Sequence, residues 1–89
     1  MKAILTVIGK DKPGIIAKVS ALLAEENVNI EDISQTVIQG NFTMIMVVDI
    51  SKSKTPLDGL VQKFNTAGKE IGVEIYLKHE DIYNAMYTV

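Results

Sequence analysis

The chain has 89 residues, a length at which a protein forms one domain around one modest hydrophobic core. Apolar residues make up 47 % and charged residues 22 %, the balance of a globular protein and not of a disordered one. The 11 acidic residues outnumber the 9 basic ones, and every basic residue is a lysine. Because the chain has neither excess positive charge nor arginine, we expect no nucleic-acid partner.

Cysteine is absent, which excludes disulfides, thiolate metal sites and a thiol nucleophile. The longest unbroken apolar run, Met44 to Val48, is far too short to span a bilayer. The first residues enter a strand-like pattern directly and do not resemble a signal peptide. We therefore expect a cytoplasmic protein with no membrane association, no cofactor and no metal.

The first part of the chain predicts a strand followed by a helix. Residues 3–9 are aliphatic at both odd and even positions and end at Gly9, which indicates a central strand. Asp11 and Pro13 are typical of a helix start. Five apolar residues then share one helical face: Ile15, Ile16, Val19, Leu22 and Leu23. Asn27 is expected to end this helix, because asparagine tolerates the left-handed conformation.

An edge strand and a hairpin are predicted next. Residues 29–39 alternate imperfectly, and the change of parity between Ile30 and Ile33 indicates a β-bulge. Gly40 and Asn41 have the composition of a two-residue hairpin turn. Residues 42–50 are again apolar at both parities and predict a second central strand.

The second helix and the last strand complete the pattern. Thr55 to Asp58 resembles a capping box with proline at the first helical position. The apolar stripe that follows reaches Ile71 and stops at Gly72. Residues 73–78 alternate as a half-buried edge strand, and residues 81–89 are expected to form a short helical tail.

The order of these elements, β-α-β-β-α-β, predicts an α+β fold of the ferredoxin-like type over residues 1–80, followed by the tail. In this fold a four-stranded antiparallel sheet carries both helices on one face. The two central strands are nevertheless apolar on both faces, so the second face needs a cover. We expect a second copy of the chain to supply it, in a homodimer or small oligomer; the short tail is the alternative.

The chain lacks the residues that several known functions of this fold require. RNA recognition requires aromatic side chains on the central strands, and only Phe42 is present there. A metallochaperone of this fold requires a cysteine pair, and a phosphate-binding enzyme site of the acylphosphatase type requires an arginine. His79 has no evident serine or aspartate partner. Since no catalytic constellation remains, we expect that the protein is not an enzyme.

The segment GKDKPGII, residues 9–16, joins a central strand to a helix. Backbone amides around Gly14, Ile15 and Ile16 are expected to be free at the helix start, where geometry and the helix dipole favour a carboxylate or phosphate. The alternative is a helix that is simply well capped.

This segment, together with NVNIEDISQT at residues 27–36 and FTMIMVVDI at residues 42–50, resembles the ACT domain. That family comprises small ferredoxin-like modules that sense amino acids in regulated metabolic enzymes. The chain is similar to the ACT domains of the glycine-cleavage regulator and of formyltetrahydrofolate deformylase. It is also similar to short proteins that consist of one ACT domain, whose tails look like residues 82–89.

The resemblance implies an amino acid or similar small effector, bound at an interface between two ACT domains. In serine-sensing members, polar groups come from positions that correspond to Asp11 and Asn29, while Gly14 permits close approach of the ligand. The chain departs from those members at Gly9, where they have a histidine, and at Asp11, where they have an asparagine. An acidic Asp11 suits a ligand ammonium group and not a carboxylate, so serine specificity is not implied.

Two functions follow from these observations. The first is a non-catalytic regulatory module that binds a small molecule of the amino-acid class as a homo-oligomer, with Asp11, Gly14, Ile15, Ile16 and Asn29 as ligand-binding residues. The alternative is a protein-interaction module that regulates a separate metabolic enzyme or transcription factor without a ligand.

Overall fold

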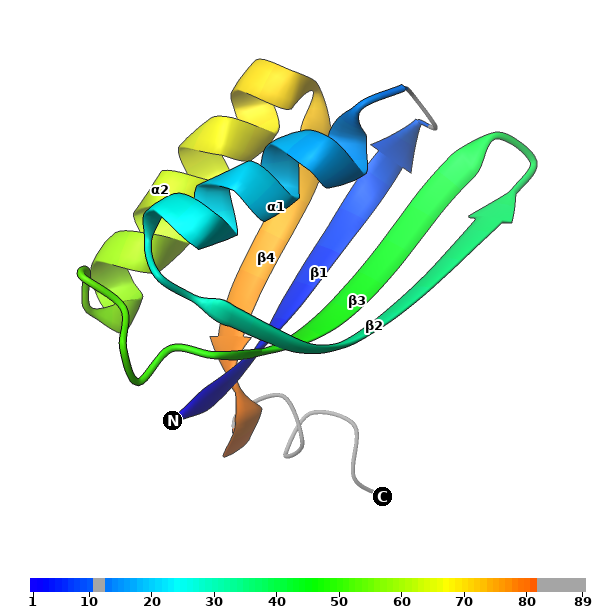
Figure 1. Ribbon diagram of the computed structural model, residues 1–89. Helices are drawn as coiled ribbons and strands as arrows, with labels where there is room; N and C mark the ends of the chain where they lie inside the picture. The colour runs from blue at the N-terminus through cyan, green and yellow to red at the C-terminus, as the bar shows by residue number, and fades with distance from the viewer. Residues whose placement is uncertain (11–12, 82–89) are drawn as a thin grey trace.

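A computed structural model describes residues 1–10 and 13–81 of the chain (Figure 1). Its elements follow the order predicted above: β1 (Lys2–Lys10), α1 (Ile15–Glu25), β2 (Asn29–Ile38), β3 (Asn41–Asp49), α2 (Leu57–Ile71) and β4 (Val73–His79). The strands form one antiparallel sheet in the order β2-β3-β1-β4, and both helices cover the same face of it. The predicted ferredoxin-like fold is confirmed.

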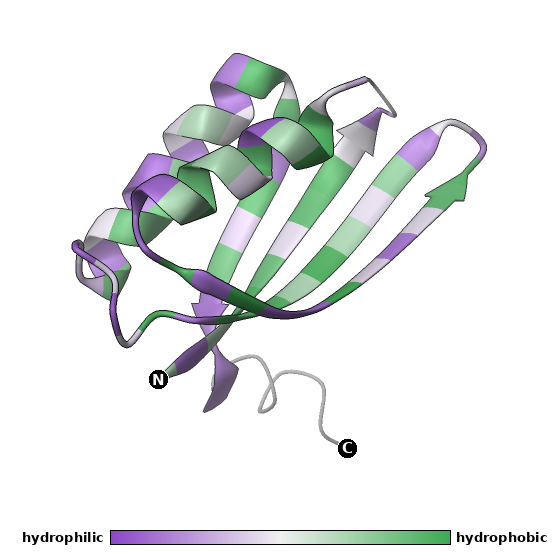
Figure 2. Ribbon diagram, viewed as in Figure 1, coloured by the Kyte–Doolittle hydropathy of each residue, from purple (hydrophilic) through white to green (hydrophobic). Residues whose placement is uncertain are grey.

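The core lies between the sheet and the helices. Buried residues alternate with more exposed ones along β3 and β4, and the buried ones, on the helix side, are apolar (Figure 2). β1 lies between β3 and β4, so that Leu5 pairs with Met46 on one side and with Leu77 on the other. The largest completely buried side chains come from both layers: Phe64, Leu5, Leu23, Met44, Met46 and Leu60.

The ends of the helices agree only in part with their predicted signals. Asn27, with a φ of 58°, follows α1 and is left-handed as expected, and Gly72, with a φ of 90°, ends α2. The predicted capping box at Thr55 is wrong, because Pro56 is the N-cap and no side chain caps this helix. The Thr55 hydroxyl instead donates to the carboxylate of Glu26, at the end of α1.

The buried stripe of α1 is narrower than predicted. Ile15, Val19 and Leu23 are buried and lie four residues apart, on one line along the helix. Ile16 is rotated about 100° away from that line and remains 38 % exposed, so its assignment to the buried face was wrong.

β2 is an edge strand with a bulge between Ile30 and Asp32, as predicted. The hairpin turn, however, consists of Gln39 and Gly40, one residue earlier than predicted. Both have positive φ, 51° and 78°, which is the signature of a type I′ turn. Asn41 is the first residue of β3, where it pairs with Ile38.

The sheet face opposite the helices is only partly apolar. Ile4 is buried there, Ile45 and Val47 are half-buried, and Ile8 and Tyr76 are exposed. Residues 82–89 of the predicted helical tail lie outside the described residues. The cover of this face by a second copy of the chain therefore stays a prediction. Neither helix in the described ranges is long and apolar enough to cross a membrane.

Candidate functional site

The first predicted site residues lie at the start of α1. Gly14 precedes the helix with a φ of 85°, and a Cβ placed on it would meet nothing within 4 Å. Among the described residues no side chain caps this helix. The first amide groups of a helix are suited to an anion. Ile15 is buried beneath the helix, and Ile16 is exposed beside it. Asp11 lies outside the described residues.

Asn29 lies at the opposite end of α1, where β2 begins (Figure 1). The 11 residues of the helix extend over about 16 Å, at 1.5 Å per residue. A molecule of amino-acid size cannot bridge that length. Within one copy of the chain, Gly14 and Asn29 therefore cannot contact the same small ligand.

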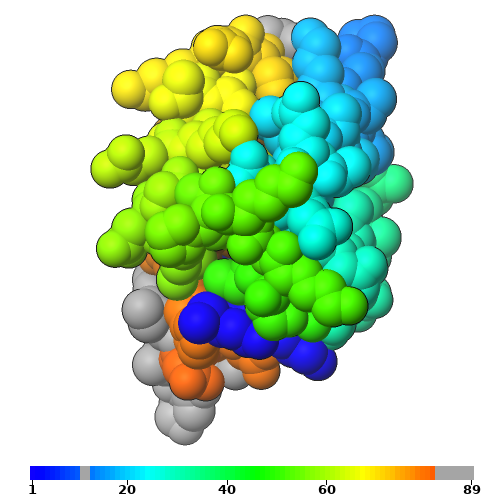
Figure 3. Space-filling model, turned by 60° about the vertical axis from the view of Figure 1, so that its left-hand side comes forward, coloured from blue at the N-terminus to red at the C-terminus, as the bar shows by residue number. Residues whose placement is uncertain are grey.

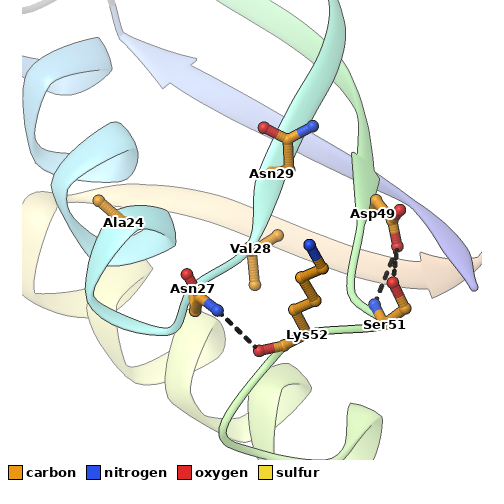
Figure 4. Close-up of a pocket in the computed structure, with 7 residues that line it drawn as sticks. All are labelled: Ala24, Asn27, Val28, Asn29, Asp49, Ser51 and Lys52. Atoms are coloured by element: carbon orange, nitrogen blue, oxygen red, sulfur yellow. Dashed lines mark hydrogen bonds between the residues drawn. The ribbon is translucent and has the colours of Figure 1, made fainter.

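Asn29 instead lines a pocket of ≈ 440 Å³ between the end of α1, the start of β2 and the loop that follows β3. Figure 4 shows its lining, which consists of Ala24, Asn27, Val28, Asn29, Asp49, Ser51 and Lys52. In the space-filling view of Figure 3 this loop (green) lies between the end of α1 (cyan) and the N-terminus (dark blue). The pocket thus combines segments that are far apart in sequence.

Hydrogen bonds hold both walls of this pocket in place. The Asn27 side chain Nδ2 donates to the carbonyl oxygen of Lys52 over 3.1 Å, which ties the turn after α1 to the loop. On the loop itself, the amide and the hydroxyl of Ser51 both donate to Oδ1 of Asp49, over 2.9 and 2.7 Å. The walls are therefore formed before any ligand arrives, which reduces the entropy lost on binding.

The charges of the pocket come from Asp49 and Lys52. Hydrogen bonds from Ser51, its hydroxyl first and then its amide, hold the pKa of the Asp49 carboxyl below its usual value. The amino group of Met1 lies 3.7 Å from the same Oδ1. Lys52 is exposed at the pocket and forms no ion pair with any described residue.

The sequence predicts Asn29 as a site residue but neither of these charged residues. A signal for Asp49 was present, because an aspartate two residues before a serine is typical of an Asx turn. Nothing local to Lys52 indicated that its loop packs beside Asn29, since that neighbourhood depends on the pairing of β2 with β3.

Packing within the fold requires a glycine at position 9, independently of any ligand. It lies on the helix side of the sheet between Phe42 and Val73, its partners on the neighbouring strands. A Cβ at this position would come within 2.7 Å of Cγ1 of Val73. A histidine cannot occupy this position without displacing Val73, so a ligand-contacting side chain is excluded here in this chain.

β2 also exposes apolar side chains. On the helix side, Ile33 and Val37 project beyond the cover of α1 and are 44 % and 53 % exposed. Ile38 at the hairpin end is 64 % exposed. Ile33 and Val37, together with the outer edge of this edge strand, form a surface suited to pairing with another chain.

Comparisons with known proteins agree with this fold and length. A family model for the ACT domain matches residues 2–78. A UPF0237 protein from Clostridium acetobutylicum is 53 % identical over 89 residues, covering all of both chains. A solved structure, an ACT domain protein from Streptococcus pneumoniae, is 47 % identical with a TM-score of 0.83 and 98 % of each chain covered.

Two larger proteins contain a similar unit. A formyltetrahydrofolate deformylase from Pseudomonas syringae is 27 % identical with a TM-score of 0.80, over 88 % of this chain and 27 % of that one. The regulatory subunit of aspartate kinase from Thermus thermophilus is 29 % identical with a TM-score of 0.67, over 86 % of this chain and 50 % of that one. The resemblance inferred from the three sequence segments is confirmed.

Proposed function

Because the chain belongs to the ACT domain family, we propose that it is a non-catalytic, cytoplasmic regulatory module that binds a small molecule of the amino-acid class between two copies of itself. One observation carries the proposal: Gly14 and Asn29, the two halves of the predicted site, lie at opposite ends of α1. Within a single copy, the two halves lie too far apart to bind the same small ligand. A two-fold dimer brings the start of α1 in one copy to the start of β2 in the other, and does so twice.

The exposed surface of β2 supports this arrangement. Its outer edge carries unpaired backbone groups, and Ile33 and Val37 beside it are apolar. Two copies related by a two-fold axis perpendicular to the sheet at this edge would cover these side chains and run their α1 helices in opposite directions. That antiparallel placement is what the divided site requires.

Chemistry at the two halves supports a zwitterionic ligand. The amides that follow Gly14, which no described side chain caps, suit a carboxylate, and Asp11 in the same loop suits an ammonium group. Asn29 can donate to or accept from either end. The similar aspartate kinase chain from Thermus thermophilus is a regulatory subunit, which supports a regulatory role for this chain.

The first experiment is a thermal-shift screen of the full chain with each standard L-amino acid. A ligand at one hundred times its dissociation constant raises the free energy of unfolding by about 2.7 kcal/mol, which moves the melting temperature by several degrees. Sedimentation on the same samples measures the mass of the assembly.

Complementation then tests the divided site. Asp11→Ala and Asn29→Ala should each abolish binding of the amino acid found in the screen. When the two variants are mixed and allowed to exchange, each heterodimer contains one site with both residues intact, so that about one quarter of the parental sites return. If the mixture binds no better than either variant alone, the site is not shared between copies.

The exposed surface of β2 favours one alternative, a protein-interaction module that regulates a separate metabolic enzyme or transcription factor without a ligand. In that case no amino acid shifts the melting temperature of the parent, and lysine substitutions on β2 abolish binding to the partner.

A further inference from the structure

The pocket beside Asn29 contains a lysine whose charge is not neutralised by the described residues. Two other lysines in these ranges, Lys2 and Lys63, each pair with a glutamate. Lys52 pairs with none, although its side chain lies along the pocket with the ammonium group directed between β2 and the end of β3 (Figure 4). The charge of this lysine is therefore available to a ligand.

Hydrogen bonds of the loop hold the backbone of Lys52 in place. Its carbonyl oxygen accepts the Asn27 side chain, and two residues later the amide of Lys54 donates to the carbonyl of Glu26 over 3.3 Å. The amide of Ser53 donates to the carbonyl of Ile50 over 3.1 Å. These bonds hold the loop against the end of α1, so only the side chain of Lys52 needs to be ordered on binding.

Asp49 on the opposite wall offers the complementary charge. Ser51 donates twice to its Oδ1, and the amino group of Met1 lies nearest to the same atom. Within the described residues the second oxygen, Oδ2, has no hydrogen bond or ion pair. It can therefore accept a hydrogen bond from a cation.

We propose that Lys52 and Asp49 are the charge-selecting residues of the Asn29 half of the effector site, and that together they select a zwitterionic α-amino acid. Lys52 binds the carboxylate, Oδ2 of Asp49 accepts from the ammonium group, and the Asn29 amide bonds between them. The proposal rests on the proposed function but changes its chemistry, because the carboxylate goes to Lys52 and not to the start of α1. The volume of ≈ 440 Å³ lies within the range of about 300–1,000 Å³ that is typical of small-molecule sites.

The test is calorimetric titration of the full chain with each standard L-amino acid and, for those that bind, with the corresponding methyl ester. Lys52→Gln should weaken binding of the amino acid by at least about tenfold, the effect of losing one hydrogen bond to a charged group. Lys52→Arg should retain most of the affinity. Lys54→Gln is the matched control, because it removes the same charge from the same loop at an exposed residue that does not line the pocket.

The methyl ester lacks the negative charge of the ligand carboxylate, whereas the Lys52→Gln variant lacks the positive charge of the protein that binds it. It should bind the parent about as weakly as the free amino acid binds the Lys52→Gln variant, and that variant should not distinguish the two ligands. Asp49→Asn should lose selectivity for the amino acid over the same molecule without its amino group. Since Lys52 is exposed, the melting temperature of its unliganded variants should stay near that of the parent. Asp49→Asn should lower the melting temperature slightly, because the lowered pKa of the Asp49 carboxyl stabilises the fold at neutral pH.

The failures of the two proposals can be told apart. If Asn29→Ala abolishes binding while Lys52→Gln and Lys54→Gln both bind as the parent does, the assignment of Lys52 is overturned and the shared site stands. If binding depends on Lys52 but the protein is a monomer that is insensitive to Asp11→Ala, the shared site fails and the assignment of Lys52 stands. If the parent binds no amino acid, both are overturned.

Discussion

The ammonium group of Lys63 on α2 donates to the carboxylate of Glu26, the last residue before the turn that ends α1. Glu26 is only 6 % exposed, and its other oxygen accepts the hydroxyl of Thr55. Its backbone carbonyl also accepts the amide of Lys54. One glutamate therefore joins α1, α2 and the loop that carries Lys52, and it supports the wall of the pocket beside Asn29.

Glu26→Gln should lower the melting temperature at neutral pH. The hydrogen bond from Lys63, followed by that from Thr55, holds the pKa of the Glu26 carboxyl below its usual value of 4.5. A carboxylate with a lowered pKa in the folded state stabilises the fold above the pKa of the unfolded state, and this contribution is lost as the pH falls through the folded pKa. The difference between parent and variant should therefore shrink below about pH 4.5.

Thermal melts of both proteins across this pH range measure the effect. Glu25→Gln is the control, because the neighbouring Glu25 is exposed and forms no ion pair in the described residues. A difference for Glu26→Gln that stays constant from neutral to acid pH would show that the carboxylate acts through packing and not through its charge.

Gly68→Ala should destabilise the protein although alanine is the better helix former. A Cβ at this position in α2 would lie 2.8 Å from the carbonyl oxygen of Val73 and 3.2 Å from Cγ1 of Ile75. The overpacking costs about 1–3 kcal/mol, which exceeds the gain of about 1 kcal/mol in helix propensity. Asn65→Ala, at an exposed position of the same helix, should be neutral or slightly stabilising. Urea unfolding of the two variants compares them, and equal stability would mean that α2 can shift away from β4.

Gln39→Asn should stabilise the hairpin between β2 and β3. Gln39 has a φ of 51° and occupies the first central position of a type I′ turn, where asparagine before glycine is preferred. The gain should be roughly 0.5–1 kcal/mol, part of the strain of a left-handed residue that is not glycine. Gln35→Asn, within the extended part of β2, should give no gain in the same urea unfolding measurement. A loss of stability at residue 39 would indicate that the glutamine side chain has a contact of its own.

Val37→Lys should weaken self-association by at least about tenfold, because it places a charge in the apolar surface proposed for the dimer. Thr36→Lys is the control, since the adjacent residue pairs with Thr43 and projects from the opposite face of the same strand. Sedimentation at several concentrations measures both. Dissociation by Thr36→Lys but not by Val37→Lys would place the contact on the open face of the sheet.

The identity and order of the elements could be predicted because their signals are local. The period of the apolar residues distinguishes strand from helix within one segment, and the positive φ of Asn27 and Gly72 reflects what those residue types tolerate. One error arose where a distant residue competed with a local signal. At Thr55 a hydroxyl suited to capping had a more favourable partner in Glu26, which is distant in sequence but close in the fold.

Local patterns are sufficient to predict a βαββαβ unit with a glycine-containing loop before α1 and an asparagine at the start of β2. The positions of Gly14 and Asn29 at opposite ends of one helix, and the pocket that Asn29 shares with Asp49 and Lys52, become visible in the folded chain. Periodicity and turn preference act between near neighbours, whereas the composition of a pocket depends on how β2 pairs with β3 and how the loop after β3 docks on the end of α1.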